Sequence, residues 1–270
     1  VEELVYIDSG LPSIAAMTML NRTPVNLSSQ SRATFYFSFV DAPISGIDLP
    51  GQVSTDAAFR AAFRQAAAEF EDLANIRFLE AGSMGEASFL VGRHAMSGAG
   101  YATVSSGPGV RTNGAPALLM INSSTDTGSL MEGNAGYSTM LQQLGRVLGL
   151  TSPIENQIRV DIADGLTGFL SQMSNGIGRS NTGLMPMDVD AVRFLYGTTG
   201  SVQINREDNV YRLTQTDTFF PALVDDAGMD TLDVSGVRGS HVVDLSGGRL
   251  SWIGFDLTML RAQFGEQALW

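Results

Sequence analysis

The sequence predicts an α+β fold, in which a mixed sheet carrying helices precedes a β-rich C-terminal region. Three observations lead to this expectation. Residues 32–40 place Phe at every second position, residues 57–74 repeat apolar side chains at helical spacing, and residues beyond about 198 form short β-like runs between turn-forming residues. With 44% hydrophobic residues among 270, the chain can bury a sizeable core, which excludes a disordered protein.

The first strand is expected at residues 32–40, because Phe35, Phe37 and Phe39 share one face of an extended chain. Residues 1–30 mix turn-forming and polar residues. We expect an irregular N-terminal arm there, with a helical turn near residues 14–20.

A long helix is expected after Ser54, Thr55 and Asp56, whose side chains can accept hydrogen bonds from free backbone N–H groups. Apolar residues then recur at helical spacing and form one stripe, which indicates a helix packed on the sheet. These residues are Phe59, Phe63, Ala66, Ala67, Phe70 and Ala74. Further short strands are expected at residues 76–79, 87–92 and 117–121.

Two more helices are expected, at residues 138–150 and 188–196, from apolar residues at helical spacing between capping residues. Their expected first and last residues are Ser138 or Thr139 and Gly149 for the first helix, and Asp188 and Gly197 for the second.

The composition of the chain changes near residues 197–200, where the predicted domain boundary lies. An arm at residues 1–30 and a sheet-and-helix domain at 31–197 precede a β-rich domain at 198–270. In the last domain, β-like runs at 209–213, 231–234 and 242–245 favour a roll or sandwich.

The charge and residue usage exclude several classes of function. All 16 basic residues are Arg, against 28 acidic ones, and the net charge of −12 argues against nucleic acid and anionic membranes as partners. The absence of Cys excludes disulfides, thiolate catalysis and Cys-ligated zinc. Both histidines, His94 and His241, are expected to be at the surface or hydrogen-bonded, not metal ligands. No apolar run approaches the roughly 18–20 residues that span a bilayer, and no secretory signal is visible.

One segment, residues 141–153, resembles the zinc helix of metzincin metallopeptidases, specifically of the serralysin family. That motif runs His-Glu-x-x-His-x-x-Gly-x-x-His followed by Pro. The frame matches here at Gly145, Leu148, Gly149, Leu150 and Pro153. Every position of the zinc chemistry differs: Gln142, Arg146 and Ser152 stand where the three His would be, and Gln143 stands where the catalytic Glu would be.

These replacements remove the chemistry that the motif's spacing serves. Two His four residues apart share one helix face, a Gly turn brings in the third, and the Glu takes a proton from metal-bound water. Gln143 cannot act as a base, and the permanent charge of Arg146 repels zinc. We hypothesise that Arg146 substitutes for the charge of the metal. Taken alone, these polar residues would instead indicate a solvated helix face.

Two later segments extend the resemblance. Met173 resembles the Met-turn residue that forms a hydrophobic floor below the metal, although Asn175 replaces the family's Tyr. Residues 185–197 resemble the helix that closes the protease domain, and residues 230–254 resemble the start of the family's C-terminal β domain. The resemblance covers about residues 32–255, and the family's glycine-rich nonapeptide repeats are missing from it.

The acidic turn at residues 225–233 carries oxygen ligands of the kind that Ca²⁺ prefers, and a solvated acidic turn is the alternative. The resemblance implies a calcium site and no zinc. The implied calcium ligands are Asn205, Glu207, Asn209, Asp225, Ala227 and Asp230.

The resemblance implies a metzincin-like domain followed by a β-roll or sandwich, in a protein that is secreted or on the cell surface. The leading hypothesis is an inactive pseudo-metallopeptidase that binds a protein or peptide in the retained cleft. One alternative is a metallopeptidase or other hydrolase with a non-standard metal site that uses Asp161, Asp164 or His94. Another is a domain of a larger calcium-dependent adhesin or surface-layer protein.

Overall fold

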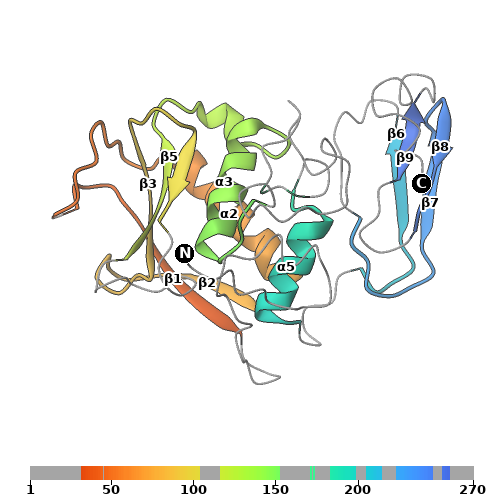
Figure 1. Cartoon of the computed structure of the whole chain (residues 1–270), viewed down its shortest axis with the longest axis horizontal. Coiled ribbons are helices and arrows are strands. Elements are labelled where there is room, and N and C mark those ends of the chain that lie inside the picture. Colours follow the sequence, from red (N-terminus) through yellow and green to blue (C-terminus); the bar gives the residue numbers. More distant parts are fainter. Residues whose placement is uncertain are drawn as a thin grey trace, which may run out of the picture.

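The computed structural model describes residues 32–44, 46–103, 116–152, 171, 173, 183–198, 205–214, 223–245 and 251–255. These residues form a mixed α+β fold in which helices pack on a five-stranded sheet, and two small two-stranded sheets follow towards the C-terminus (Figure 1). No helix in the described part of the chain is long and apolar enough to cross a membrane.

The five-stranded sheet has the strand order β2-β1-β3-β5-β4. Its first four members in this order are parallel, and the short edge strand β4 is antiparallel to β5. The strands are β1 (Ala33–Phe39), β2 (Ile76–Glu80), β3 (Phe89–His94), β4 (Gly100–Ala102) and β5 (Ala117–Asn122). The four strands predicted in this region are confirmed. Strand β4 was not predicted, because its three residues are too few to show a periodic pattern.

Helix α2 (Ala57–Leu73) connects β1 to β2 and covers one face of the sheet. The Phe59 N–H donates to Asp56 Oδ1 (2.8 Å), so the predicted N-cap is confirmed. The Phe63 ring is fully buried, with its centroid 4.8 Å from that of Phe37 and 5.6 Å from that of Phe39. Burial of one such side chain contributes about 2–3 kcal/mol.

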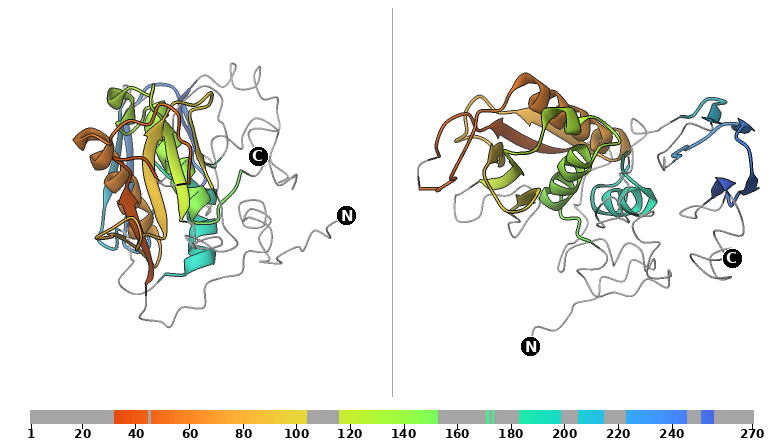
Figure 2. Two further views of the ribbon diagram at one scale, coloured as in Figure 1. Left: turned by 90° about the vertical axis from the view of Figure 1, so that its left-hand side faces the viewer. Right: turned by 90° about the horizontal axis from the view of Figure 1, so that it is seen from above.

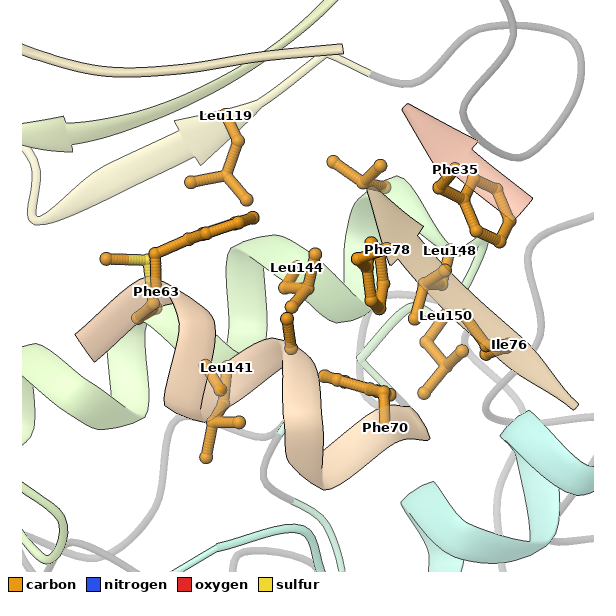
Figure 3. Packing of buried hydrophobic residues seen from close by; sticks show 14 of the residues in the cluster. Phe35, Phe63, Phe70, Ile76, Phe78, Leu119, Leu141, Leu144, Leu148 and Leu150 are labelled. Atoms are coloured by element: carbon orange, nitrogen blue, oxygen red, sulfur yellow. The ribbon is translucent and has the colours of Figure 1, made fainter. Parts of the chain in front are cut away.

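Helix α3 (Ala135–Val147) lies beside α2 on the same face of the sheet (Figures 1 and 2). Figure 3 shows how side chains of the two helices and the strands meet in this core, among them Phe63, Leu119 and Leu144. The helix begins before the predicted Ser138 or Thr139, so those caps are wrong. A Cβ on Gly136 would be 2.6 Å from Ser129 Oγ, and this close packing against the 3-10 turn η1 (Thr127–Leu130) accompanies the earlier start.

Helix α5 (Pro186–Tyr196) also starts earlier than predicted, because Pro186 takes the first helical turn. Asp188 is therefore at the third helical position and not at the N-cap, which is Met185. The predicted end is confirmed: Gly197 has a φ of +70°, which favours glycine.

The opposite face of the sheet carries a second, smaller apolar cluster. Ile44 and Ile47, from the loop after β1, pack against it, as do Met84, Met96 and Tyr101. The buried members of this cluster are Val40, Leu49, Ala87, Leu90, Leu118 and Met120. Both faces of β3 and β5 are thus covered, as expected for inner parallel strands.

The C-terminal region contains β6 (Val210–Thr214) parallel to β7 (Thr231–Gly236), and β8 (Ser240–Val242) antiparallel to β9 (Trp252–Phe255). The predicted strands at 209–213 and 231–234 are confirmed. The strand predicted at 242–245 is wrong, because β8 ends at residue 242 and the apolar Leu245 is 88% exposed. The described residues show two small sheets and not a roll. The arm at residues 1–30 and the boundary at 199–200 lie outside the described residues and stay predictions.

Candidate functional site

Helix α3 carries the segment that resembles a zinc helix, and its end has the shape that the motif predicts. Gly149 has a φ of +94°, a conformation that glycine adopts readily. The Gly149 N–H donates to the Arg146 carbonyl (3.0 Å), and the Leu150 N–H donates to the Gly145 carbonyl (2.9 Å). These two bonds make a Schellman cap, which turns the chain sharply towards Ser152.

The four positions of the zinc chemistry fall in two environments. Gln142 and Arg146 are half-buried and one helical turn apart, so they share one face of α3. Gln143 and Ser152 are buried, each 6% exposed. Among the described residues, Gln143 Oε1 has no hydrogen-bond partner. Gln143, at the position that corresponds to the catalytic Glu of the motif, is therefore a buried neutral amide.

Met173 packs directly under α3. A Cβ on Gly145 would be 2.6 Å from the Met173 sulfur, so only a glycine lets the methionine approach this closely. Met173 is 3% exposed. Asn175 and Pro153, and the alternative ligands Asp161 and Asp164, lie outside the described residues.

A buried carboxylate holds this methionine in place. The Ser171 hydroxyl donates to Asp188 Oδ1 (2.8 Å), and the Met173 N–H donates to the Ser171 oxygen (2.9 Å). The other oxygen of Asp188 accepts from the Met185 N–H (2.8 Å). Asp188 is fully buried. It caps the start of α5 from the third helical position, through the Met185 N–H, and it also links Met173 to that helix through Ser171. The position of Asp188 at the start of a predicted helix did not indicate that Ser171 would be its partner.

Tyr196, at the end of α5, reaches the end of α3. Its hydroxyl donates to the Leu148 carbonyl (2.6 Å), and the whole side chain is 1% exposed. This bond satisfies one of the carbonyls that a helix end leaves without a partner. Helices α3 and α5 are therefore locked together next to the motif.

Glu69 of α2 contacts Tyr137 of α3 and was not identified from the sequence. Its Oε1 accepts from the Tyr137 hydroxyl (2.5 Å) and its Oε2 from the Leu184 N–H (3.2 Å). Burial raises the pKa of Glu69 to about 7, against the effect of these two hydrogen bonds; the charges of Glu132 and Asp72 raise it further. Burial also raises the pKa of Tyr137.

The edge strand β4 runs beside α3. The Cβ position of Gly100 is 3.1 Å from Thr139 Cγ2 on α3. Within the described sheet, β4 pairs only with β5. A strand edge therefore stands next to the helix that carries Gln142 and Arg146.

The predicted calcium ligands come together in one loop cluster before β6 and β7. A Cβ on Gly228 would be 2.6 Å from the Glu207 carbonyl oxygen and 3.0 Å from Asp230 Oδ1, so both oxygens line one small space. Asn209 joins them, because its N–H donates to Asp230 Oδ1 (2.9 Å) and its Nδ2 donates to the Glu207 carbonyl (2.6 Å).

The other predicted ligands border Tyr211. The Tyr211 hydroxyl donates to Asp225 Oδ2 (2.6 Å), and the Ala227 N–H donates to Asp225 Oδ1 (3.1 Å). Burial raises the pKa of Tyr211 to about 12, and Asp225 and Asp230 act in the same direction, while a hydrogen bond with Asn205 lowers it. All six predicted residues thus belong to one neighbourhood. In the described part of the chain, no three His, Cys, Asp or Glu residues are grouped to hold a metal ion, so backbone and amide oxygens would have to complete the site.

The two histidines differ. His241 is exposed and its Nδ1 accepts from the Gly254 N–H (3.0 Å), which confirms the expectation for it. His94 is 7% exposed, and neither ring nitrogen has a hydrogen-bond partner among the described residues. The expectation that His94 is at the surface or hydrogen-bonded is wrong, because the strand that it ends is buried on both faces.

No family model matches the chain, and no curated protein matches it. Among solved structures, the chain is similar to the protein described as "Structure of myroilysin". The TM-score is 0.39 and the sequence identity is 12%, over 61% of this chain and 92% of that chain.

Proposed function

We propose that this protein is a catalytically inactive, peptidase-like binding module. The observation that carries this proposal is the pairing of Gln142 and Arg146 on one face of α3, at the two helix positions that the motif reserves for metal ligands. A guanidinium stays charged at all physiological pH values and repels a divalent cation at contact distance. The amide of Gln143 cannot take a proton from water. A mixed sheet with helices is consistent with the protease-like fold that the motifs imply.

The binding surface in this proposal is the edge of β4 together with the neighbouring face of α3. An extended peptide adds to a strand edge through backbone hydrogen bonds, and nearby side chains select its residues. Arg146 would favour a peptide with an acidic side chain or a terminal carboxylate at that position.

The first experiment measures zinc content and proteolysis on the same sample. Protein purified without chelator should contain far less than one zinc per chain, and it should not cleave casein in the presence of added zinc. A variant with Gln142→His, Gln143→Glu, Arg146→His and Ser152→His should gain zinc binding. Cleavage by the unmodified chain that a chelator abolishes would refute the proposal and favour the hydrolase alternative.

The second experiment tests peptide binding. A peptide selected from a random library by the unmodified protein should lose affinity by roughly tenfold when Arg146→Ala removes one charge-assisted contact. Arg77→Ala provides the control, because Arg77 is exposed on β2 at the far edge of the sheet. Equal losses in both variants would show that the charge acts only at long range and would contradict the assigned surface.

We also propose that the loop cluster around Gly228 binds Ca²⁺, in a protein that works outside the cell. The donor set fits a calcium ion because it consists of carboxylate, amide and backbone oxygens on loops. The residues that would hold the ion are Asn205, Glu207, Asn209, Asp225, Ala227 and Asp230. The ion would link the loop before β6 to the loop before β7.

Thermal unfolding with and without calcium tests this site. Added Ca²⁺ should raise the unfolding temperature, and Asp230→Asn should abolish that rise, while Asp48→Asn, at an exposed position of another loop, should leave it intact. An equal calcium effect in Asp230→Asn would contradict the site. Calcium-driven assembly of the unmodified chain would favour the surface-layer alternative.

A further inference from the structure

The imidazole of His94 is buried at the end of β3 without a hydrogen-bond partner in the described structure. A buried polar group without a partner destabilises a fold, so its retention calls for an explanation such as a bound ion. A neutral imidazole has one ring nitrogen with a free lone pair, which makes it a metal ligand.

Two methionines lie in or against the apolar cluster on the face of β3 that carries this imidazole. Met120 of β5 is fully buried, and its sulfur is 3.1 Å from the Cβ position of Gly92, two residues before His94 on the same face of β3. Because Gly92 has no side chain, the methionine can lie over the strand that carries His94. Met96, two residues after His94, packs against the same apolar cluster and is partly buried.

Two further contacts hold the segment after β3 in place. The side-chain amide of Asn122, which is opposite His94 in the sheet register, donates to the Met96 carbonyl (2.7 Å). The ring of Tyr101 meets the His94 ring edge to face, with 5.6 Å between the centroids and 77° between the planes. Tyr101 is also opposite Met120 in the register, so one aromatic ring borders both candidate ligands.

The surroundings select the kind of ion. Tyr101, which borders both candidate ligands, is partly buried against the same apolar cluster. The chain has no Cys, and the side chains of Met96 and Met120 are thioethers within or against an apolar cluster. Ions that need oxygen or thiolate ligands, such as Ca²⁺, Mg²⁺ and most structural Zn²⁺, do not fit this donor set. Thioether and imidazole ligands suit Cu(I), whose single charge is also the least costly to bury.

We propose that His94, Met96 and Met120 form a binding site for one Cu(I) ion on the face of the sheet opposite α2 and α3. The ion reaches the site past Met96, the more exposed of the two methionines. This site shares strand β4 with the proposed peptide-binding surface, through Tyr101, but uses the opposite face of the sheet from α3, and it is separate in sequence from the calcium loop cluster.

A competition titration tests the proposal on the full chain. Under reducing, oxygen-free conditions, the protein should take one Cu(I) per chain from the chelator bicinchoninate, and X-ray absorption at the copper edge should show sulfur as well as nitrogen neighbours. Met96→Leu keeps the size and packing of the side chain and should weaken Cu(I) binding by at least roughly tenfold. His94→Phe should weaken it further.

Two control variants separate the site from general metal binding. Met229→Leu changes a methionine that is 83% exposed, and His241→Gln changes the exposed histidine; both should bind Cu(I) as the unmodified chain does. Failure to take Cu(I) from the chelator, unchanged affinity in Met96→Leu, or copper without sulfur neighbours would each overturn the proposal. The absorption measurement uses only the unmodified protein, so it decides the matter even where a variant folds poorly.

Discussion

Replacing Glu69 by Gln should remove a pH-dependent part of this protein's stability. The carboxylate bridges α2, Tyr137 of α3 and the Leu184 N–H, which precedes α5. Its other charged neighbours are Glu132, before α3, and Asp72, on α2. Both are acidic, so no cation among these neighbours compensates the buried negative charge.

The size and sign of the effect follow from the pKa. Burial raises the pKa of Glu69 from 4.5 to about 7 in the folded state, so between these values the folded protein binds more protons than the unfolded chain. The free energy of unfolding from this group is therefore greatest below pH 4.5 and falls as the pH rises through about 7. The shift corresponds to about 2–3 kcal/mol after allowance for solvent screening of a partly exposed side chain.

Urea unfolding at several pH values measures this effect. In Glu69→Gln, the amide can donate to the Tyr137 oxygen and its carbonyl can accept from the Leu184 N–H, so the packing is retained without a charge. Relative to the unmodified protein, the variant should gain about 2–3 kcal/mol between pH 4.5 and pH 8. Glu86→Gln, at an exposed turn, should leave the pH dependence as it is. A stability difference between Glu69→Gln and the unmodified chain that does not change with pH would refute the reasoning.

Three further changes test the packing around the candidate site by urea unfolding. Gly145→Ala places a Cβ 2.6 Å from the Met173 sulfur and should destabilise the protein by about 1–3 kcal/mol. The same change made in a Met173→Ala variant should cost much less relative to that variant, because the sulfur is then absent. Ser171→Ala leaves a buried oxygen of Asp188 without its donor and should destabilise by about 1–3 kcal/mol. Phe63→Ala empties a fully buried position and should destabilise by about 3–5 kcal/mol; a loss below about 1 kcal/mol would contradict the described core.

The secondary structure could be predicted wherever a periodic pattern was long enough. The alternating Phe residues of β1 and the apolar stripe of α2 both gave elements close to those described. The short strand β4 and the earlier starts of α3 and α5 were missed. Those features depend on neighbours distant in sequence, such as Ser129 against Gly136, or on Pro186 taking the first turn of a helix.

The sequence by itself determined the resemblance of residues 141–153 to a zinc helix, because the frame around Gly149 can be read from spacing alone. It also determined the turn at Gly149, since the conformation there is one that glycine readily adopts. Only the tertiary structure decided the partners of the buried polar groups: Asp188 with Ser171, Glu69 with Tyr137, and His94 with none among the described residues. The physical reason is that burial and hydrogen bonding arise where separate elements meet, and a local pattern of side chains carries no information about that meeting.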